Sequence, residues 1–266
     1  MSTLDVDALT RSFGGVHAVE ALSFEIRPGT VHSIIGPNGA GKTTLLNLLT
    51  GVYRPDAGRI VFGGVDLTGA PPHRFARAGI ARTFQNLQVF FNMTAVENVM
   101  TGRHRLERAG VVAALLRTPR LARAEAECRA SALAWLRFLD LAGSAERGAD
   151  TLPYGALKRL EIARALAGEP RLLLLDEPAA GLNASEALEI GALIRRVAAT
   201  GTTVVLVEHN MRLVMEVSDH ILVLDHGRRL AEGNAAQVRG DPAVIEAYLG
   251  VAAEATQHAA SETADA

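Results

Sequence analysis

The stretch that decides the fold is Gly36-Pro37-Asn38-Gly39-Ala40-Gly41-Lys42-Thr43-Thr44. It follows a short β-rich run, residues 31–35, and opens a leucine-rich stretch with helical spacing, residues 43–50. This is the context of a phosphate-binding loop, because glycines let successive backbone N–H groups turn inward around phosphate oxygens. We expect all nine residues to bind a nucleotide, with Lys42 between the β- and γ-phosphates and the Thr43 hydroxyl on Mg²⁺. The alternative, an ordinary glycine-rich turn, is disfavoured by the complete pattern.

A second pattern follows the apolar run at residues 172–175, which has the composition of a buried strand. Asp176 and Glu177 come directly after this run, at the strand end where α/β sheets bind their ligands. We expect Asp176 to hold Mg²⁺, directly or through water, and Glu177 to accept a proton from an attacking water. An acidic turn after a buried strand is the alternative, which the phosphate-binding loop makes weaker.

Apolar runs recur at residues 172–175, 203–207 and 221–224, with a helical segment between each pair. Such runs predict strands that are buried on both faces of a parallel sheet. Asn183, with Glu186 three residues later, has the spacing of a helix capping box. From residue 94 to 168, arginine, alanine, leucine and glutamate dominate, which predicts an insert of several helices. The sequence therefore predicts an α/β protein with a helical insert.

Composition limits the class of protein. The chain has 266 residues, of which 48% are hydrophobic and 21% charged, so it is neither a disordered chain nor a disulfide-stabilised miniprotein. Its net charge of −2 argues against general nucleic-acid binding, and a single cysteine favours a reducing cytoplasm. The N-terminal residues lack the basic region of a signal peptide, and the longest apolar stretch, residues 109–116, falls short of the roughly 20 residues of a membrane span.

Two further segments separate the classes of P-loop protein. Residues 152–161 read LPYGALKRLE and precede the second motif, and His209 follows the run at 203–207. A lone histidine after a strand is usually structural, but here the strand end should abut the phosphate site. The order of these segments resembles the ATP-binding subunit of an ABC transporter, over nearly the whole chain from residue 9 to about residue 250.

The resemblance implies roles for individual residues. Gln85, in the segment Arg82-Thr83-Phe84-Gln85-Asn86, would be the glutamine that senses Mg²⁺ and the attacking water, and His209 the switch histidine. Phe13 would stack on adenine, a position where many members carry tyrosine. Tyr154 and Gly155 would lie in the signature loop, which reaches the γ-phosphate bound by a second subunit. Residues 180–183 would form the D-loop.

The resemblance also implies the domain organisation. The expected fold is a P-loop, RecA-like ATPase core with an antiparallel β subdomain and a helical insert subdomain. We expect the first part of the core with the β subdomain at 1–92, the insert with the signature loop at 93–168, and the second part of the core at 169–235. A C-terminal helix at 236–250 and a disordered tail at 251–266 complete the expectation.

Within the family, the chain is most similar to the larger, LivG-type ATPase of branched-chain amino-acid importers. Four segments carry this likeness: Arg11-Ser12-Phe13-Gly14-Gly15, Arg82–Gln85, Asp176–Asn183 and Glu208-His209-Asn210-Met211. The likeness implies ATP hydrolysis with Mg²⁺, coupled to uptake of branched-chain or related amino acids. It implies a heterodimer with a second ATPase, two transmembrane permease subunits, an external solute-binding protein that acts indirectly, and no nucleic acid. The chain would lie peripherally on the cytoplasmic face of the inner membrane.

The sequence departs from the family pattern in the signature loop. Pro153 stands where serine is usual, and Ala156 where glutamine or glutamate is common. Proline removes a hydroxyl and a backbone N–H, each a contact to the γ-phosphate of the opposite site, so hydrolysis should be slower. The alternative is that proline preorganises the loop for binding through its backbone. Asn183 replaces the usual aspartate of the D-loop, as in the branched-chain group.

Three rival functions differ in what they require. An ABC ATPase that acts on DNA or the ribosome would need a long coiled-coil insert, a zinc-binding cysteine pair or two ATPase cassettes in one chain. A GTP-binding switch would need an Asn-Lys-x-Asp motif to recognise guanine. The sequence has none of these features. The third rival, transport of urea, short amides or another solute, stays open, because partner chains choose the solute.

Two segments have open interpretations. Residues 89–93, Val-Phe-Phe-Asn-Met, could receive a helix from a membrane subunit, or they could belong to the core of the insert. The arm at 103–129 has seven arginines against three glutamates, which could touch anionic lipid or form a solvated helical face.

Overall fold

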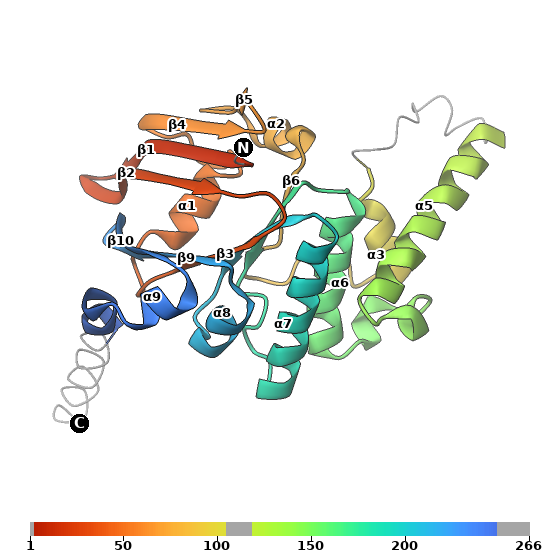
Figure 1. Cartoon of the computed structure of the whole chain (residues 1–266). Helices are drawn as coiled ribbons and strands as arrows, with labels where there is room; N and C mark the ends of the chain where they lie inside the picture. The colour runs from red at the N-terminus through yellow and green to blue at the C-terminus, as the bar shows by residue number, and fades with distance from the viewer. Residues whose placement is uncertain (1–2, 105–118, 249–266) are drawn as a thin grey trace, which may run out of the picture.

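The computed structural model describes residues 3–104 and 119–248, which fold into two β-sheets and a set of surrounding helices (Figure 1). Two predictions lie outside the described residues: the tail at 251–266, and most of the arm at 103–129 with the apolar stretch at 109–116. In the described ranges, every helix is too short or too polar to cross a membrane.

The larger sheet has six strands in the order β10-β9-β3-β8-β7-β6. Its strands are β3 (Val31–Ile35), β6 (Ile80–Arg82), β7 (Leu172–Asp176), β8 (Thr203–Val207), β9 (His220–Asp225) and β10 (Arg228–Gly233). The five strands from β9 to β6 run parallel, and β10 pairs antiparallel with β9 at the edge. The predicted runs are therefore strands of one parallel sheet, with β3, β7 and β8 buried along their whole length.

The smaller sheet is antiparallel and has the order β2-β1-β4-β5. Its strands are β1 (Leu4–Phe13), β2 (Val16–Ile26), β4 (Ala57–Phe62) and β5 (Val65–Asp66). In Figure 1 this sheet lies above helix α1 (Lys42–Leu48), with the larger sheet on the other side of the helix. One core cluster joins all three layers, for example through Leu4 of β1, Leu45 of α1 and Leu174 of β7.

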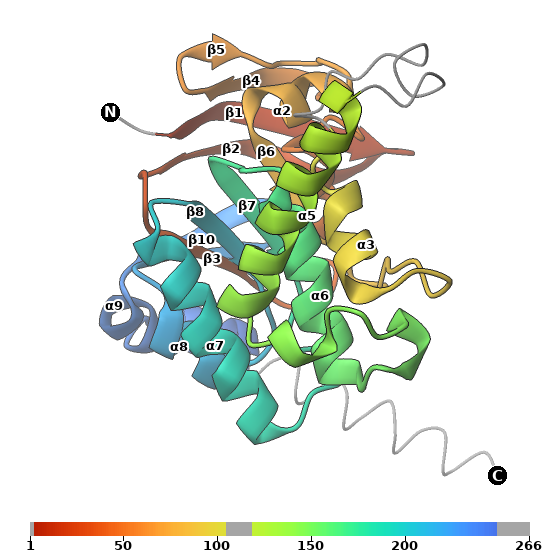
Figure 2. The ribbon, with the colours of Figure 1, turned by 90° about the vertical axis from the view of Figure 1, so that its right-hand side faces the viewer.

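The helices from 94 to 168 gather beside the larger sheet, as Figures 1 and 2 show from two directions. They are α3 (Ala95–Thr101), α5 (Pro119–Phe138), two short 3₁₀ turns (Ala142–Ser144 and Ala149–Thr151) and α6 (Tyr154–Ala167). Their core continues onto the lower face of the sheet and onto α7 (Ala184–Ala199). Because side chains alternate along a strand, Leu173 and Leu175 belong to this core, whereas Leu172 and Leu174 face α1.

A third, smaller core lies near the C-terminal end of the described chain. It joins Ile35, the last residue of β3, to α8 (Met211–Val217) and α9 (Ala235–Arg239) and to a helical segment at 242–248. The remaining helix, α2 (Pro72–Ala78), buries Phe75 in the core beside α1. The structure therefore has the predicted α/β core, antiparallel sheet and helical insert, while the exact domain limits stay predictions.

Candidate functional site

The predicted site residues follow four neighbouring strands of the larger sheet. The strands β3, β8, β7 and β6 lie side by side and run parallel, so their carboxyl ends share one edge. The glycine-rich loop follows β3, Gln85 follows β6, Glu177 follows β7 and His209 follows β8. Parallel sheets bind ligands at this edge, and the fold thus gathers segments more than 170 residues apart in sequence at one place.

Two glycines of the loop have no room for a side chain. A Cβ atom at Gly36 would lie 2.1 Å from the Leu224 carbonyl oxygen, and one at Gly41 would lie 2.1 Å from the Ala18 carbonyl oxygen. Both residues have positive φ, 151° and 96°, a conformation that L-residues with a side chain rarely adopt. The loop is therefore fixed by β9 at its start and by β2 at its end.

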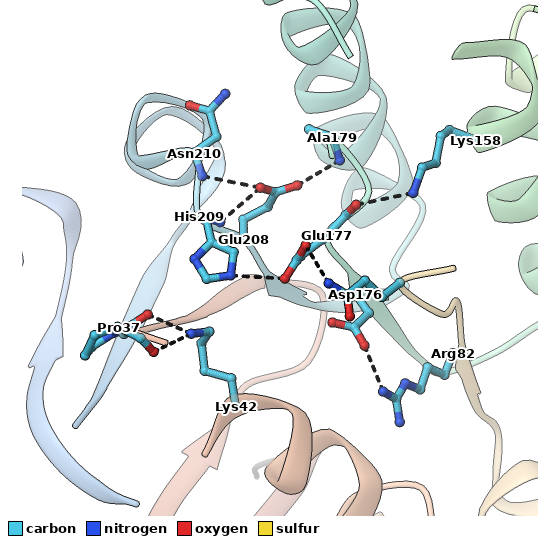
Figure 3. A network of polar contacts seen from close by, with 12 residues as sticks. Pro37, Lys42, Arg82, Lys158, Asp176, Glu177, Ala179, Glu208, His209 and Asn210 are labelled. Atoms are coloured by element: carbon cyan, nitrogen blue, oxygen red, sulfur yellow. Dashed lines mark hydrogen bonds and ion pairs between the residues drawn. The ribbon is translucent and has the colours of Figure 1, made fainter. Parts of the chain in front are cut away.

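Lys42 lies under this loop and is 7% exposed. Its Nζ donates to the carbonyl oxygens of Gly36 at 2.7 Å and Pro37 at 2.8 Å (Figure 3). Burial lowers the pKa of Lys42, and the nearby carboxylates of Glu177 and Asp176 oppose that shift. An ammonium group has three donors, so one N–H remains for an anion held by the loop.

Gln85, Glu177 and His209, which the sequence analysis assigns to separate roles, come together in the structure. The two carboxylate oxygens of Glu177 have different partners: Oε2 accepts from Gln85 Nε2 at 3.2 Å, and Oε1 lies 3.0 Å from His209 Nε2. A carboxylate only accepts, so this contact is a hydrogen bond when His209 carries a proton on Nε2. Glu177 has φ +49°, and its N–H donates to the Val207 carbonyl at 2.9 Å. The backbone at the predicted base is therefore in a strained region, held by its neighbour strand.

Asp176 makes a buried ion pair that the sequence reasoning missed. Its Oδ2 lies 2.8 Å from Arg82 Nη2, and both side chains are about 5% exposed. Arg82 also donates to Asn47 Oδ1 of α1 at 2.6 Å and stacks over the Phe84 ring at 5.0 Å. In the sequence, Arg82 stands out only as part of the segment around Gln85. Its basic character within an apolar strand was the available signal.

The oxygens expected for Mg²⁺ come from Thr43, Gln85 and Asp176. Thr43 is exposed at the start of α1, and Asp176 keeps Oδ1 free of the Arg82 contact. Among the described residues, no group of three His, Cys, Asp or Glu side chains could hold a metal by itself. This composition fits a Mg²⁺ that arrives with a nucleotide, because such ions take most ligands from phosphate and water.

Phe13 ends β1 and is 39% exposed. Its ring meets the edge of Tyr53 at 5.2 Å between centroids, and the Arg11 guanidinium lies 4.7 Å from its centroid. Partial exposure on a supported ring is compatible with stacking on a base.

Tyr154 and Gly155 pack against the loop that follows β7, and not against the glycine-rich loop. A Cβ atom at Gly181 would lie 3.1 Å from the Tyr154 ring, and one at Gly155 would lie 3.1 Å from Glu186 Oε1. Pro153 precedes the first helical residue of α6, is extended (φ −65°, ψ 156°) and makes no side-chain cap. The first turn of α6 therefore begins without a side-chain cap, beside the loop that follows β7.

Three more buried charges connect these loops and were missed. Lys158 Nζ approaches the Glu177 carbonyl at 3.5 Å, and Glu161 accepts from the Phe84 and Gln88 N–H groups at 3.5 and 3.3 Å. Burial raises the pKa of Glu161. Glu208, directly before His209, is 4% exposed and accepts three backbone N–H groups. In the sequence, the signal for these three residues is a charged side chain within a segment that is otherwise expected to be buried.

A groove of about 660 Å³ lies between α2, β6 and α6, and its lining includes Val89 and Phe90. Phe90 is 46% and Phe91 50% exposed, so these rings are not core of the helical insert. Arg164 lies 5.6 Å from the Phe90 centroid at the side of the groove.

Comparisons with known proteins agree with this geometry. A family model for ABC transporters matches residues 19–180, and one for the branched-chain amino acid ATP-binding cassette transporter matches residues 228–254. The high-affinity branched-chain amino acid transport ATP-binding protein BraF of Pseudomonas aeruginosa is 47% identical, covering 94% of this chain and 98% of the relative. LivG of Escherichia coli K12 is 44% identical with the same coverage.

Solved structures agree in fold. A nucleotide-free ATP-binding cassette from an ABC transporter superposes with a TM-score of 0.81 at 33% identity, covering 93% of this chain and 99% of that one. An ATP-binding cassette of an ABC transporter in its ADP conformation also gives 0.81, at 32% identity, with 94% and 99% coverage.

Proposed function

The chain belongs to the ATP-binding, ATP-hydrolysing proteins of ABC transporters, and from this membership we propose that it powers uptake of branched-chain or related amino acids. The observation that carries the hydrolytic part is Glu177, held by Gln85 on one carboxylate oxygen and by His209 on the other. The solute is supported by the match of residues 228–254 and by the relatives' names.

We propose that the loop at 36–44 binds the nucleotide phosphates, with the free Lys42 N–H directed to the β- and γ-phosphates and Phe13 stacked on the adenine. The Thr43 hydroxyl, Asp176 Oδ1 and Gln85 would hold Mg²⁺. Bound there, the ion would neutralise charge that develops on the phosphoryl oxygens. Arg82 pairs with Oδ2 of Asp176, which leaves Oδ1 for the ion.

Glu177 accepts the proton of the attacking water as the oxygen approaches the γ-phosphorus. Gln85 and His209 hold the carboxylate in place, so little rearrangement is needed at the moment of reaction. The imidazole of His209, with its proton on Nε2, can donate to the γ-phosphate when the nucleotide draws it away from Glu177.

The site needs partner chains in this proposal. The signature loop at Tyr154 and Gly155 packs beside the loop that follows β7 and would complete the site of a second ATPase, in a heterodimer. The groove lined by Phe90 would receive a helix of one of two transmembrane permease subunits, with the exposed rings of Phe90 and Phe91 as anchors. The chain would then lie on the cytoplasmic face of the inner membrane. An external solute-binding protein would act through the permeases, and nucleic acid has no part.

The test of the chemistry is Glu177→Gln in the assembled transporter. This variant keeps the size of the side chain and one of its two acceptor oxygens but not its basicity, so ATP binding should persist while turnover falls about 10²–10⁴-fold. Glu127→Gln, at an exposed position of α5, is the matched control. Near-normal turnover in the Glu177 variant refutes the assignment.

The test of the solute compares stimulation of ATP hydrolysis by the partner binding protein. Loaded with leucine, isoleucine or valine, the binding protein should raise the turnover of the transporter in vesicles above the value without solute. Stimulation by urea or a short amide, with no response to the three amino acids, supports the rival importer.

A further inference from the structure

The side chain of Glu208 joins the loop after β7 to the loop after β8. Its Oε1 accepts the Ala179 N–H at 2.8 Å, and its Oε2 accepts the N–H groups of His209 at 3.1 Å and Asn210 at 3.4 Å (Figure 3). The residue is 4% exposed. One buried carboxylate therefore satisfies three backbone donors from two loops.

The hydrogen bonds of Glu208 lie just beyond the point where the pairing of β7 with β8 ends. The pairing of β7 with β8 runs to Asp176 opposite Val207, and one further bond, from Glu177 N–H to the Val207 carbonyl, follows at 2.9 Å. Beyond it, in the part of the chain that the structure describes, no backbone hydrogen bond joins residues 178–183 to residues 208–210. Beyond the end of the β7–β8 pairing, the Glu208 carboxylate supplies the hydrogen bonds that connect the two loops.

The connection forms a closed ring with the predicted base. From Glu177 the chain runs through Pro178 to Ala179, then across the Glu208 carboxylate to His209, whose Nε2 returns to Glu177 Oε1 at 3.0 Å. A shift of Ala179 therefore moves the backbone that carries the imidazole. On its far side, Asn210 caps α8 by accepting the Leu213 N–H, which fixes the other end of the histidine loop.

The residues after Ala179 lead to the surface that, in the proposed assembly, contacts a second ATPase. Gly181 lies against the Tyr154 ring, and Asn183 opens α7 with a complete capping box to Glu186. In the proposed assembly, Tyr154 belongs to the loop that faces a second ATPase. Ala179 is therefore the first buried point between that interface and the catalytic carboxylate.

We propose that Glu208 is a positioning residue: it holds the loop at 178–183 and the His209 loop as one unit, so that approach of the second subunit sets His209 relative to Glu177. This inference rests on the proposed role of Glu177 as the base. A carboxylate is needed because three N–H groups converge on it. An amide in its place would offer one oxygen and turn an N–H₂ toward donors.

The experiment is a double-mutant cycle in the assembled transporter with Glu208→Gln, His209→Ala and the double variant. Glu208→Gln should lower kcat about 10–100-fold, the scale of a misplaced catalytic group, while the KM for ATP changes less than twofold. If Glu208 acts through His209, the double variant should be no slower than His209→Ala alone. Glu216→Gln, exposed on α8, serves as the control and should behave as wild type.

Two outcomes overturn the proposal: wild-type kcat in Glu208→Gln, or effects of the two single changes that multiply in the double variant. If circular dichroism shows that Glu208→Gln is unfolded, Glu208→Asp replaces it in the same cycle, because it keeps the charge and shortens the reach by one methylene. The Glu177→Gln result is independent, so a multiplicative cycle beside an inactive Glu177 variant rejects the positioning role alone.

Discussion

His32 makes the stability of this fold depend on pH. It lies in β3, pairs in register with His220 of β9, and the two rings are 5.1 Å apart. Burial, and secondarily the neighbouring His220, lowers the pKa of His32 from its ordinary 6.5 to about 4. Asp219 and Glu232 partly oppose this shift. Nε2 of His32 also accepts the Arg27 N–H at 3.4 Å, a contact that requires an unprotonated nitrogen.

The sign of the effect follows from proton uptake. In the unfolded chain the His32 imidazole binds a proton near pH 6.5, whereas in the folded chain it does so only near pH 4. The stability contributed by the neutral form is therefore fully present above pH 6.5 and is lost as the pH falls toward 4. The whole gap corresponds to a ceiling of about 3 kcal/mol, and the part lost between pH 7.5 and 5.0 is about 2 kcal/mol.

The assay is urea unfolding of wild type and His32→Gln at pH 7.5 and at pH 5.0. Glutamine keeps an acceptor for the Arg27 N–H but does not titrate, so the variant should lose about 2 kcal/mol less than wild type over this interval. His73→Asn, which removes an exposed histidine from α2, should follow wild type. Equal losses in wild type and His32→Gln would refute the reasoning, because shared carboxylate titrations cancel in the comparison.

Three further outcomes are expected. Phe13→Ala should weaken ATP binding by roughly 1–3 kcal/mol in a titration of the purified chain, the scale of base stacking, and an unchanged affinity rejects the stacking role. Pro153→Ser adds an N-cap acceptor and restores an N–H, so ATPase turnover of the full complex should rise up to about tenfold with little change in nucleotide affinity; an unchanged or lower rate favours preorganisation by proline. Arg82→Met leaves the Asp176 carboxylate buried without its cation and should cost about 3–5 kcal/mol of unfolding free energy, which the added change Asp176→Leu should largely restore; additive losses contradict a direct ion pair.

Local patterns in the sequence determined much of the fold. The runs at 31–35 and 203–207 coincide with β3 and β8, and the helical segment expected between the runs at 203–207 and 221–224 is α8. Asn183 and Glu186 form the predicted capping box. These features rest on interactions within a few residues or on burial of both faces of a strand, which composition and period reveal directly. The first strand, β1, was overlooked, although its alternation of apolar and acidic residues is typical of a half-buried strand.

In the candidate site, too, some features could be predicted from local sequence patterns and others could not. The phosphate-binding loop could be predicted because its nine residues are contiguous. Glu177 could be proposed from its place after the apolar run at 172–175, and Gln85 and His209 took their roles from the family resemblance. Their convergence on one carboxylate depends on the strand order β3-β8-β7-β6, which no local pattern contains.

Only the tertiary structure decided which buried charged residues hold the residues of the candidate site in place. Arg82 and Asp176 are 94 residues apart and meet because β6 lies beside β7. Glu208 reads in sequence as one more acidic residue before a histidine, and its role depends on three N–H groups that two loops direct at it. Hydrogen bonds act over about 3 Å and depend on direction, so their partners are set by how strands and loops pack, and not by the residues beside them in the chain.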